Sequence, residues 1–140
     1  MNNYKPIDTP IAKGDAIGPE KCPTTPEEIE KMSRVPYATA IGKLMYAVQC
    51  TRPDIAFAVH VLGRYQSNPG IAHWKAIKRI LRYLKGTSDY MLCYRGPDLH
   101  LVGYSDASYG GNCENQRSTS RYAFLINRGA ITWLRRNKLV

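Results

Sequence analysis

The sequence lacks any long apolar run. No stretch approaches the roughly 18 consecutive apolar residues of a membrane-spanning helix, and the start MNNYKPIDTP has no apolar core of a secretory signal. We therefore expect an intracellular chain, cytoplasmic or nuclear, that does not insert into a membrane. With 44% hydrophobic residues and ten tyrosines, the chain has enough apolar side chains to fold.

Metal-binding and disulfide patterns are also missing. The four cysteines are far apart, with no C-x-x-C pair and no histidine at ligand spacing, which argues against a zinc site or a disulfide framework. The three histidines are isolated in the sequence, and such histidines are usually ordinary core or surface residues. The cysteines are Cys22, Cys50, Cys93 and Cys113, and the histidines are His60, His73 and His100.

The sequence has none of the common catalytic loops. It contains no G-x-x-x-x-G-K-[ST] phosphate loop, no G-x-S-x-G elbow and no H-E-x-x-H helix. Carboxylates are scarce over residues 99–140, where Asp106 and Glu114 are the only two. Because two-metal phosphoryl chemistry holds its ions about 4 Å apart between several carboxylates, these residues cannot supply a complete two-metal site.

Negative charge is in short supply as well. The chain has 20 lysines and arginines against 11 aspartates and glutamates, a net charge of +9. The excess is uneven, because residues 31–140 contain 17 of the basic residues and five of the acidic ones. An excess of this size favours a polyanionic partner, most commonly nucleic acid, although solubility alone could also explain it.

The beginning of the chain has the composition of a linker followed by a helix. Five of the nine prolines precede residue 27, and we expect an extended linker over residues 1–24. Thr25, Pro26 and Glu28 have the spacing of a helix N-cap with a capping box. They predict a short helix that ends near Ser33.

Apolar residues three or four positions apart predict two further helices. The first follows Pro36, and the second begins with Thr51 as its cap, has Asp54 in its first turn and ends at Asn68. Their apolar stripes are Tyr37, Ile41, Leu44 and Val48 in the first helix, and Ile55, Val59, Leu62 and Tyr65 in the second.

A fourth helix is predicted over IAHWKAIKRILRYLKG, ending at Gly86. At about 100° per residue its apolar and basic side chains fall on opposite sides. A basic face is usually just solvated, but five cations without an acid exceed what solubility requires, so nucleic-acid contact stays open beside it. The apolar set is Trp74, Ile77, Ile80, Leu81 and Leu84, and the basic set is Lys75, Lys78, Arg79, Arg82 and Lys85.

After Gly86 the period of the pattern changes from helix to strand. DYMLCYRGPDLHLVGYSD predicts two strands joined at RGPD, and RYAFLINRGAITWLRR predicts a hairpin in which Gly129 takes a left-handed turn position. The expected fold class is therefore α+β, with a helical bundle followed by a small antiparallel sheet.

Asp106 in GYSDASYGG has two possible roles. If this stretch is extended, Asp106 shares a face with Val102 and Tyr104, where a charge is costly unless a partner such as a metal ion binds it. Alternatively, Asp106 begins a turn over SYGG, as aspartates commonly do. The stretch alone leaves both interpretations open.

Four strings together resemble the Pol polyprotein of copia-type LTR retrotransposons of plants. They are VPYATAIGKLMYAVQCTRPDIAFAVHVLGRYQSNPG, HWKAIKRILRYLKGT, GYSDASYGG and QRSTSRYAFLINRGAITW, in this order. The resemblance implies that residues 25–86 are thumb-like helices of a reverse transcriptase that grip template and primer. It implies that residues 90–140 are the opening strands of a truncated ribonuclease H-like domain. Asp106 then matches that domain's first metal-binding aspartate, with magnesium as the cofactor, and the turn interpretation becomes the weaker one.

The sequence also departs from the family pattern. The polymerase aspartates of the family are expected upstream of Met1, and the remaining ribonuclease H acids beyond Val140. Ser108 stands where the family usually has a second aspartate, and Arg121 stands where it usually has a glycine. Both active sites are therefore expected to be truncated, as in a decayed element copy or a fragmentary gene model.

The expected function is that of a fragment of a retrotransposon reverse transcriptase and ribonuclease H polyprotein. We expect it to bind an RNA/DNA hybrid or duplex, and to be inactive alone as an RNA-directed DNA polymerase or ribonuclease. The rest of the Pol polyprotein is a further expected partner if the chain is part of a longer product. The alternative is a non-catalytic interaction protein that reuses a retroelement-derived fold.

Overall fold

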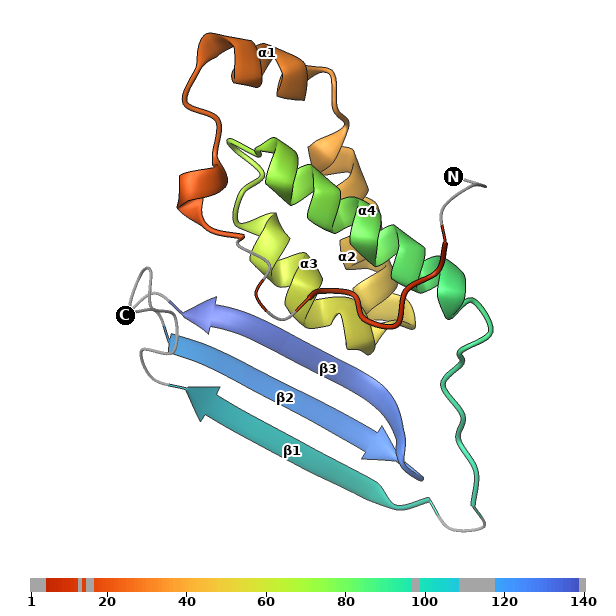
Figure 1. The fold of residues 1–140 in the computed structure, drawn as a ribbon. Coiled ribbons are helices and arrows are strands. Elements are labelled where there is room, and N and C mark those ends of the chain that lie inside the picture. The colour runs from red at the N-terminus through yellow and green to blue at the C-terminus, as the bar shows by residue number, and fades with distance from the viewer. Residues whose placement is uncertain (1–4, 13, 15–16, 97–98, 109–117, 139–140) are drawn as a thin grey trace. The chain divides into compact units, whose positions relative to one another are not determined.

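The computed structural model describes residues 5–12, 14, 17–96, 99–108 and 118–138, except for the side chains of residues 108, 118–119 and 135–138. The chain divides into a helical unit, Met1–Tyr90, and a sheet unit, Met91–Val140 (Figure 1). Helices and an antiparallel sheet follow one another as expected, which confirms the α+β class.

The helical unit contains four α-helices and two short 3₁₀ helices among its described residues. They are η1 (Pro19–Lys21), α1 (Pro26–Ser33), α2 (Tyr37–Cys50), η2 (Pro53–Ile55), α3 (Ala56–Gly63) and α4 (Ile71–Gly86). The capping box of α1 is confirmed, since the Glu28 backbone N–H donates to Thr25 Oγ1 at 3.4 Å. No helix in the described part of the chain has the length and apolar character needed to cross a membrane.

The core of the helical unit forms from the two predicted apolar stripes. All eight stripe residues are buried, and Ile41, Ile55 and Leu62 are completely buried. Full burial of such a side chain contributes about 1.5–3 kcal/mol. The Tyr37 hydroxyl also donates to the Leu62 carbonyl at 2.8 Å and links α2 to α3.

The predicted third helix is wrong at both ends. Thr51 caps the end of α2, where its N–H donates to the Ala47 carbonyl at 3.0 Å. Pro53 disfavours helical backbone at Arg52, so the chain breaks there and resumes as η2 and then α3. The α-helix ends at Gly63 and not at Asn68.

The core side of α4 is rotated slightly from the predicted one. Ile77 and Ile80 are completely buried as expected, but His73 and Tyr83 are buried with them. The other three predicted apolar residues, Trp74, Leu81 and Leu84, are only partly buried against the core.

The sheet unit has three antiparallel strands in the order β1-β2-β3 (Figure 1). Their bounds are β1 (Leu101–Ser108), β2 (Ser118–Ile126) and β3 (Gly129–Lys138). The strand predicted before RGPD is wrong, because residues 90–96 form no strand. This segment is held through a side chain instead, with the Tyr94 hydroxyl donating to the Ala130 carbonyl at 2.7 Å.

The hairpin between β2 and β3 is confirmed, but its turn differs from the prediction. Asn127 and Arg128 have φ values of 47° and 68°, so these two residues and not Gly129 take the left-handed positions. Gly129 serves close packing, because a Cβ there would lie 2.6 Å from Tyr94 Cδ1 and 2.7 Å from the Cys93 carbonyl.

The described residues of the sheet unit form no buried apolar core. Gly129 is the only one of them in the buried class. Many apolar side chains of the strands are exposed, namely Leu101, Val102, Tyr104, Tyr122, Phe124, Ile131 and Leu134.

Candidate nucleic-acid interface

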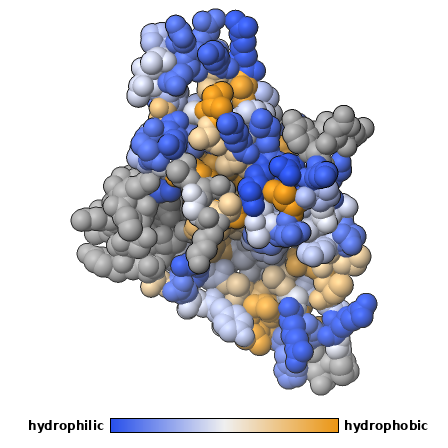
Figure 2. Space-filling view, in the orientation of Figure 1, coloured by the Kyte–Doolittle hydropathy of each residue, from blue (hydrophilic) through white to orange (hydrophobic). Residues whose placement is uncertain are grey.

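All five predicted nucleic-acid-binding residues lie on α4, and that helix contains no acidic residue. Lys75 and Lys85 are exposed, whereas Lys78, Arg79 and Arg82 are half-buried. The visible surface over α1 is largely hydrophilic, whereas hydrophilic and hydrophobic side chains both lie over α4 (Figure 2). The five side chains therefore lie on one helix, but they differ in how far they are exposed to solvent.

Arg79 and Arg82 hold the N-terminal segment of residues 5–12 against α4 (Figure 1). Arg79 donates through Nε to the Thr9 carbonyl at 3.2 Å and through Nη2 to Thr9 Oγ1 at 3.0 Å. Arg82 Nε donates to the Lys5 carbonyl at 2.8 Å. Sequence reasoning missed these contacts, because they join residues 70 or more positions apart.

The N-terminal segment also packs on the end of α4 and on the core. A Cβ at Gly86 would lie 2.8 Å from Pro6 Cβ, and Ile7 and Ile11 are partly buried against the core. Within the described part of the chain, neither Lys75 nor Lys78 forms a hydrogen bond or an ion pair. In the half of α4 that precedes the contacts with the N-terminal segment, Lys75 and Lys78 are the lysine side chains.

A cluster around Arg52 fixes the C-terminal end of α4. Arg52 binds both carboxylate oxygens of Asp54, at 3.0 and 2.8 Å. It also donates to Thr87, to the carbonyl at 3.1 Å and to Oγ1 at 2.6 Å, and its guanidinium lies 5.5 Å from the centre of the Tyr83 ring. The Tyr83 hydroxyl donates to Asp54 at 2.8 Å. Because Thr87 and Tyr83 belong to α4 and its cap, the cluster ties the helix to η2.

The charges in this cluster reinforce one another. Burial acts to raise the pKa of Asp54, but the hydrogen bonds from Arg52 and Tyr83 outweigh it and lower that pKa overall. The hydrogen bond with Asp54 raises the pKa of Arg52. Both groups are therefore charged at neutral pH, and the cluster is an internal ion pair of the fold.

His73 fixes the N-terminal end of α4. It is completely buried, its Nδ1 accepts a 2.9 Å hydrogen bond from the Gly70 N–H, and its ring stacks on Tyr65 at 4.2 Å. Nε2 is buried without a partner of normal hydrogen-bond geometry. Burial lowers the pKa of His73, with Gly18 and Glu20 acting weakly against it. A neutral, structural histidine agrees with the ordinary core role expected from the sequence.

Asp106 lies within β1, which excludes the turn interpretation. It stands directly opposite Arg121 of β2, and Arg121 Nη2 lies 3.2 Å from Asp106 Oδ2. The Asp106 side chain is 62% exposed, so its charge is not buried on an apolar face. The pattern of residue types around Asp106 contained no signal for this pairing, which depends on the strand register.

The surroundings of Asp106 do not fit a magnesium site. Magnesium keeps several waters and needs at least one or two carboxylates, and Asp106 supplies only the minimum of one in the described part of the sheet. Its strand partner is a cation. Among the described residues, no group of three or more histidine, cysteine or acidic side chains could hold a metal ion.

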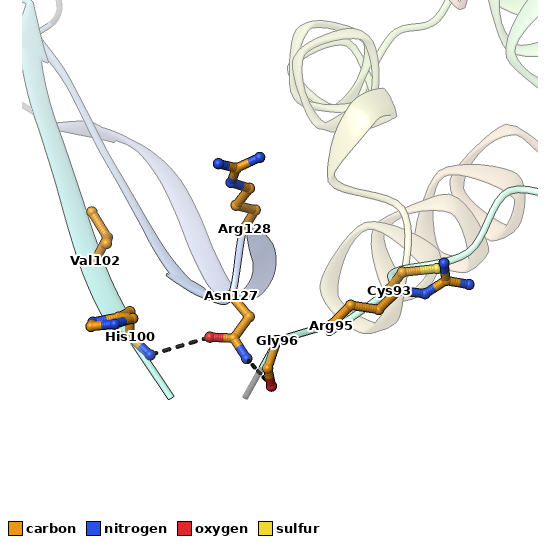
Figure 3. A pocket seen from close by; sticks show the side chains of 7 residues that line it. All are labelled: Cys93, Arg95, Gly96, His100, Val102, Asn127 and Arg128. Carbon is orange, nitrogen blue, oxygen red and sulfur yellow. Dashed lines mark hydrogen bonds between the residues drawn. The ribbon is translucent and has the colours of Figure 1, made fainter. Parts of the chain in front are cut away.

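A pocket of about 640 Å³ lies in the sheet unit, between the Asn127–Arg128 turn and the segment that leads into β1 (Figure 3). Asn127 lines the pocket, where its side chain accepts from the His100 N–H at 3.2 Å and donates to the Gly96 carbonyl at 3.4 Å. Figure 3 shows the guanidinium groups of Arg95 and Arg128 pointing in different directions. The pocket therefore does not bring its charges together on one ligand position.

Curated relatives include retrotransposon proteins and a secreted protein. The chain is 50% identical over 133 residues to the retrovirus-related Pol polyprotein from transposon TNT 1-94 of Nicotiana tabacum. It is 35% identical over 134 residues to the retrovirus-related Pol polyprotein from transposon RE2 of Arabidopsis thaliana. It is also 48% identical over 103 residues to the secreted RxLR effector protein 161 of Plasmopara viticola.

These matches differ in how much of each protein they cover. Each of the two Pol polyproteins matches 95% of the chain, but the matched region is only 10% of the tobacco protein and 9% of the Arabidopsis protein. The match to the effector covers 73% of the chain and 72% of that protein. No family model matches the chain, and no solved structure is significantly similar to it.

Proposed function

We propose that the chain is a fragment of a Ty1/copia-type retrotransposon Pol polyprotein, and that it comprises the end of the reverse transcriptase and the start of ribonuclease H. The order of the two units supports this proposal, since a helical unit followed by antiparallel strands is what the resemblance implies. In this proposal α1 to α4 are thumb-like helices and β1 to β3 are the opening strands of the nuclease.

The proposed activity of the chain itself is binding of a template–primer, as an RNA/DNA hybrid or duplex. The observation that carries it is the basic side of α4, which presents Lys75 and Lys78 without an internal partner and without an acid on the same helix. Lysines along a phosphate backbone release condensed counterions, and this release makes binding strong at low salt and weak at high salt. The excess of positive charge over residues 31–140 adds a long-range attraction of the same sign.

The test is the salt dependence of hybrid binding by the full chain. Fluorescence anisotropy with a labelled RNA/DNA hybrid gives the binding constant between about 50 and 200 mM salt. We expect a linear log-log plot. Because each phosphate contact contributes a slope of about 0.9, the double variant Lys75→Ala, Lys78→Ala should have a slope shallower by about two.

The matched control removes the same charge elsewhere. The double variant Lys31→Ala, Lys43→Ala takes one lysine from α1 and one from α2 and should leave the slope within error of the original chain. Circular dichroism establishes that both double variants keep their helices. An equal loss of slope in both variants would show that net charge and not α4 determines binding.

Catalysis is not part of the proposed activity of this chain alone. The described residues bring no set of carboxylates together, and Asp106 is paired with Arg121. Two-metal cleavage needs ions held on both sides of the reacting phosphate. The acids for that chemistry would have to come from the rest of a Pol polyprotein.

A second candidate function is that of a non-catalytic interaction protein. The specific observation in its favour is the effector relative, because the match extends over 72% of that protein. This chain also contains the letters R-I-L-R at residues 79–82, but they lie within α4, where Arg79 and Arg82 bind the N-terminal segment. This second function would be favoured if the chain did not bind the hybrid at low salt, or if its binding constant did not change with salt.

A further inference from the structure

Arg121 and Asp106 form a cross-strand pair in the sheet unit. Their positions are directly opposite in the register of β1 and β2, and directly opposite side chains have Cβ atoms about 4.5–5.5 Å apart. The 3.2 Å distance from Arg121 Nη2 to Asp106 Oδ2 is that of a direct ion pair. The carboxylate therefore has a cation supplied by the neighbouring strand.

A divalent ion at Asp106 would have to replace or approach that guanidinium. Two features act against the ion. Arg121 occupies one carboxylate oxygen, and its positive charge repels any further cation that approaches the same group. Asp106 is the only acidic residue in the described part of the sheet unit, so no second acid there adds a ligand that would offset this repulsion.

We infer that Arg121 takes the place of a metal ion at Asp106, so that this position is an internal ion pair between β1 and β2 and not a metal site. The pair is solvent-exposed, with 49% of the Arg121 side chain and 62% of the Asp106 side chain accessible. Exposed pairs contribute little to stability. The main consequence of the Arg121–Asp106 pair is that the one carboxylate of β1 already has a counterion.

The experiment measures metal binding directly, without nucleic acid, so its result is independent of whether the chain binds a hybrid. Mn²⁺ is titrated into the ¹⁵N-labelled full chain, and paramagnetic broadening is followed at the amides of residues 104–107. In the original chain these amides should not broaden selectively. In Arg121→Thr, which keeps a residue favoured in strands, they should broaden at roughly tenfold lower Mn²⁺, the size expected for a unit charge acting on a nearby divalent ion.

Two further variants control for charge and for the ligand. Arg121→Lys keeps a cation at the same position and should behave as the original chain. The double variant Arg121→Thr, Asp106→Asn should lose the broadening gained by Arg121→Thr, which assigns that gain to the carboxylate. Selective broadening in the original chain that Asp106→Asn abolishes would overturn the inference. So would equal broadening in the original chain and Arg121→Thr, or none in either one.

Discussion

Replacing Arg52 with alanine should destabilise the helical unit by about 2 kcal/mol. Arg52 makes two bonds to Asp54 and two to Thr87, and its side chain is 13% exposed. Removing one partner of a fully buried ion pair costs about 3–5 kcal/mol, whereas an exposed pair contributes about 1 kcal/mol at most. Asp54 remains 35% exposed and can be solvated after the change, so the expected cost lies between these limits.

Thermal unfolding followed by circular dichroism at a helical wavelength measures this effect in the full chain. For a unit of this size, about 2 kcal/mol corresponds to a fall of roughly 10 °C in the midpoint. Arg52→Lys should lie between the alanine variant and the original chain, because lysine keeps the charge but cannot form the two-pronged contact with Asp54.

The matched control is Arg34→Ala. Arg34 pairs with Glu30 at 3.1 Å, but the two side chains are 81% and 71% exposed and four residues apart on α1. Such pairs contribute about 0.3–0.5 kcal/mol, so the midpoint should fall by only a degree or two. If Arg52→Ala and Arg34→Ala had the same small effect, the Arg52 cluster would not be what holds α4 to η2.

Three other predictions concern the N-terminal end of α4, the N-terminal segment and the hairpin. The pKa of His73 is lower in the folded state than in the unfolded state, so the unfolded state binds a proton at higher pH. The free energy of unfolding should therefore fall as the pH drops below about 6.5. His73→Asn should flatten this dependence in a pH series of urea titrations, and an unchanged dependence would assign it to another group. The double variant Arg79→Ala, Arg82→Ala should speed amide exchange of residues 5–12, and unchanged exchange would contradict the role of these arginines. Gly129→Ala should destabilise the hairpin by about 1–3 kcal/mol through overpacking. Arg128→Gly should stabilise it by about 1 kcal/mol, because glycine adopts the left-handed backbone at this position without strain. If amide protection in the hairpin were higher in Gly129→Ala than in Arg128→Gly, the turn geometry would be refuted.

The parts of the fold that sequence reasoning predicted correctly are those that depend on nearby residues. The capping box of α1 joins positions three apart, and the apolar stripes of α2 and α3 repeat every three or four residues. The β2–β3 hairpin joins adjacent strands. Propensity and periodicity contain this information directly, so these predictions were confirmed.

The errors in the sheet unit arise where a distant contact decides the local structure. Residues 90–96 have strand-like composition, but they meet β3 through the Tyr94 side chain and not through a backbone ladder. Gly129 was expected in the turn because glycine favours left-handed backbone, yet its small size serves the contact with Tyr94. Neither contact is visible in the neighbouring sequence.

The candidate site shows the same division. The five basic residues of α4 were correctly placed on one helix, because helical spacing predicts this. That Arg79 and Arg82 bind residues 5–9, and that Arg121 pairs with Asp106, depends on the packing of the N-terminal segment and on strand register. Whether Lys75 and Lys78 contact nucleic acid stays a prediction.

The most direct test of the central claim combines binding and cleavage in one measurement. The full chain is incubated with an RNA/DNA hybrid labelled on the RNA strand, in magnesium and at low salt, and the mixture is run on a native gel and then on a denaturing gel. The proposed function predicts a complex that dissociates as salt is raised, with the RNA strand intact in every lane. Absence of a complex at low salt, or cleavage of the RNA that Asp106→Asn abolishes, would contradict a Pol segment that binds template–primer without a complete catalytic site.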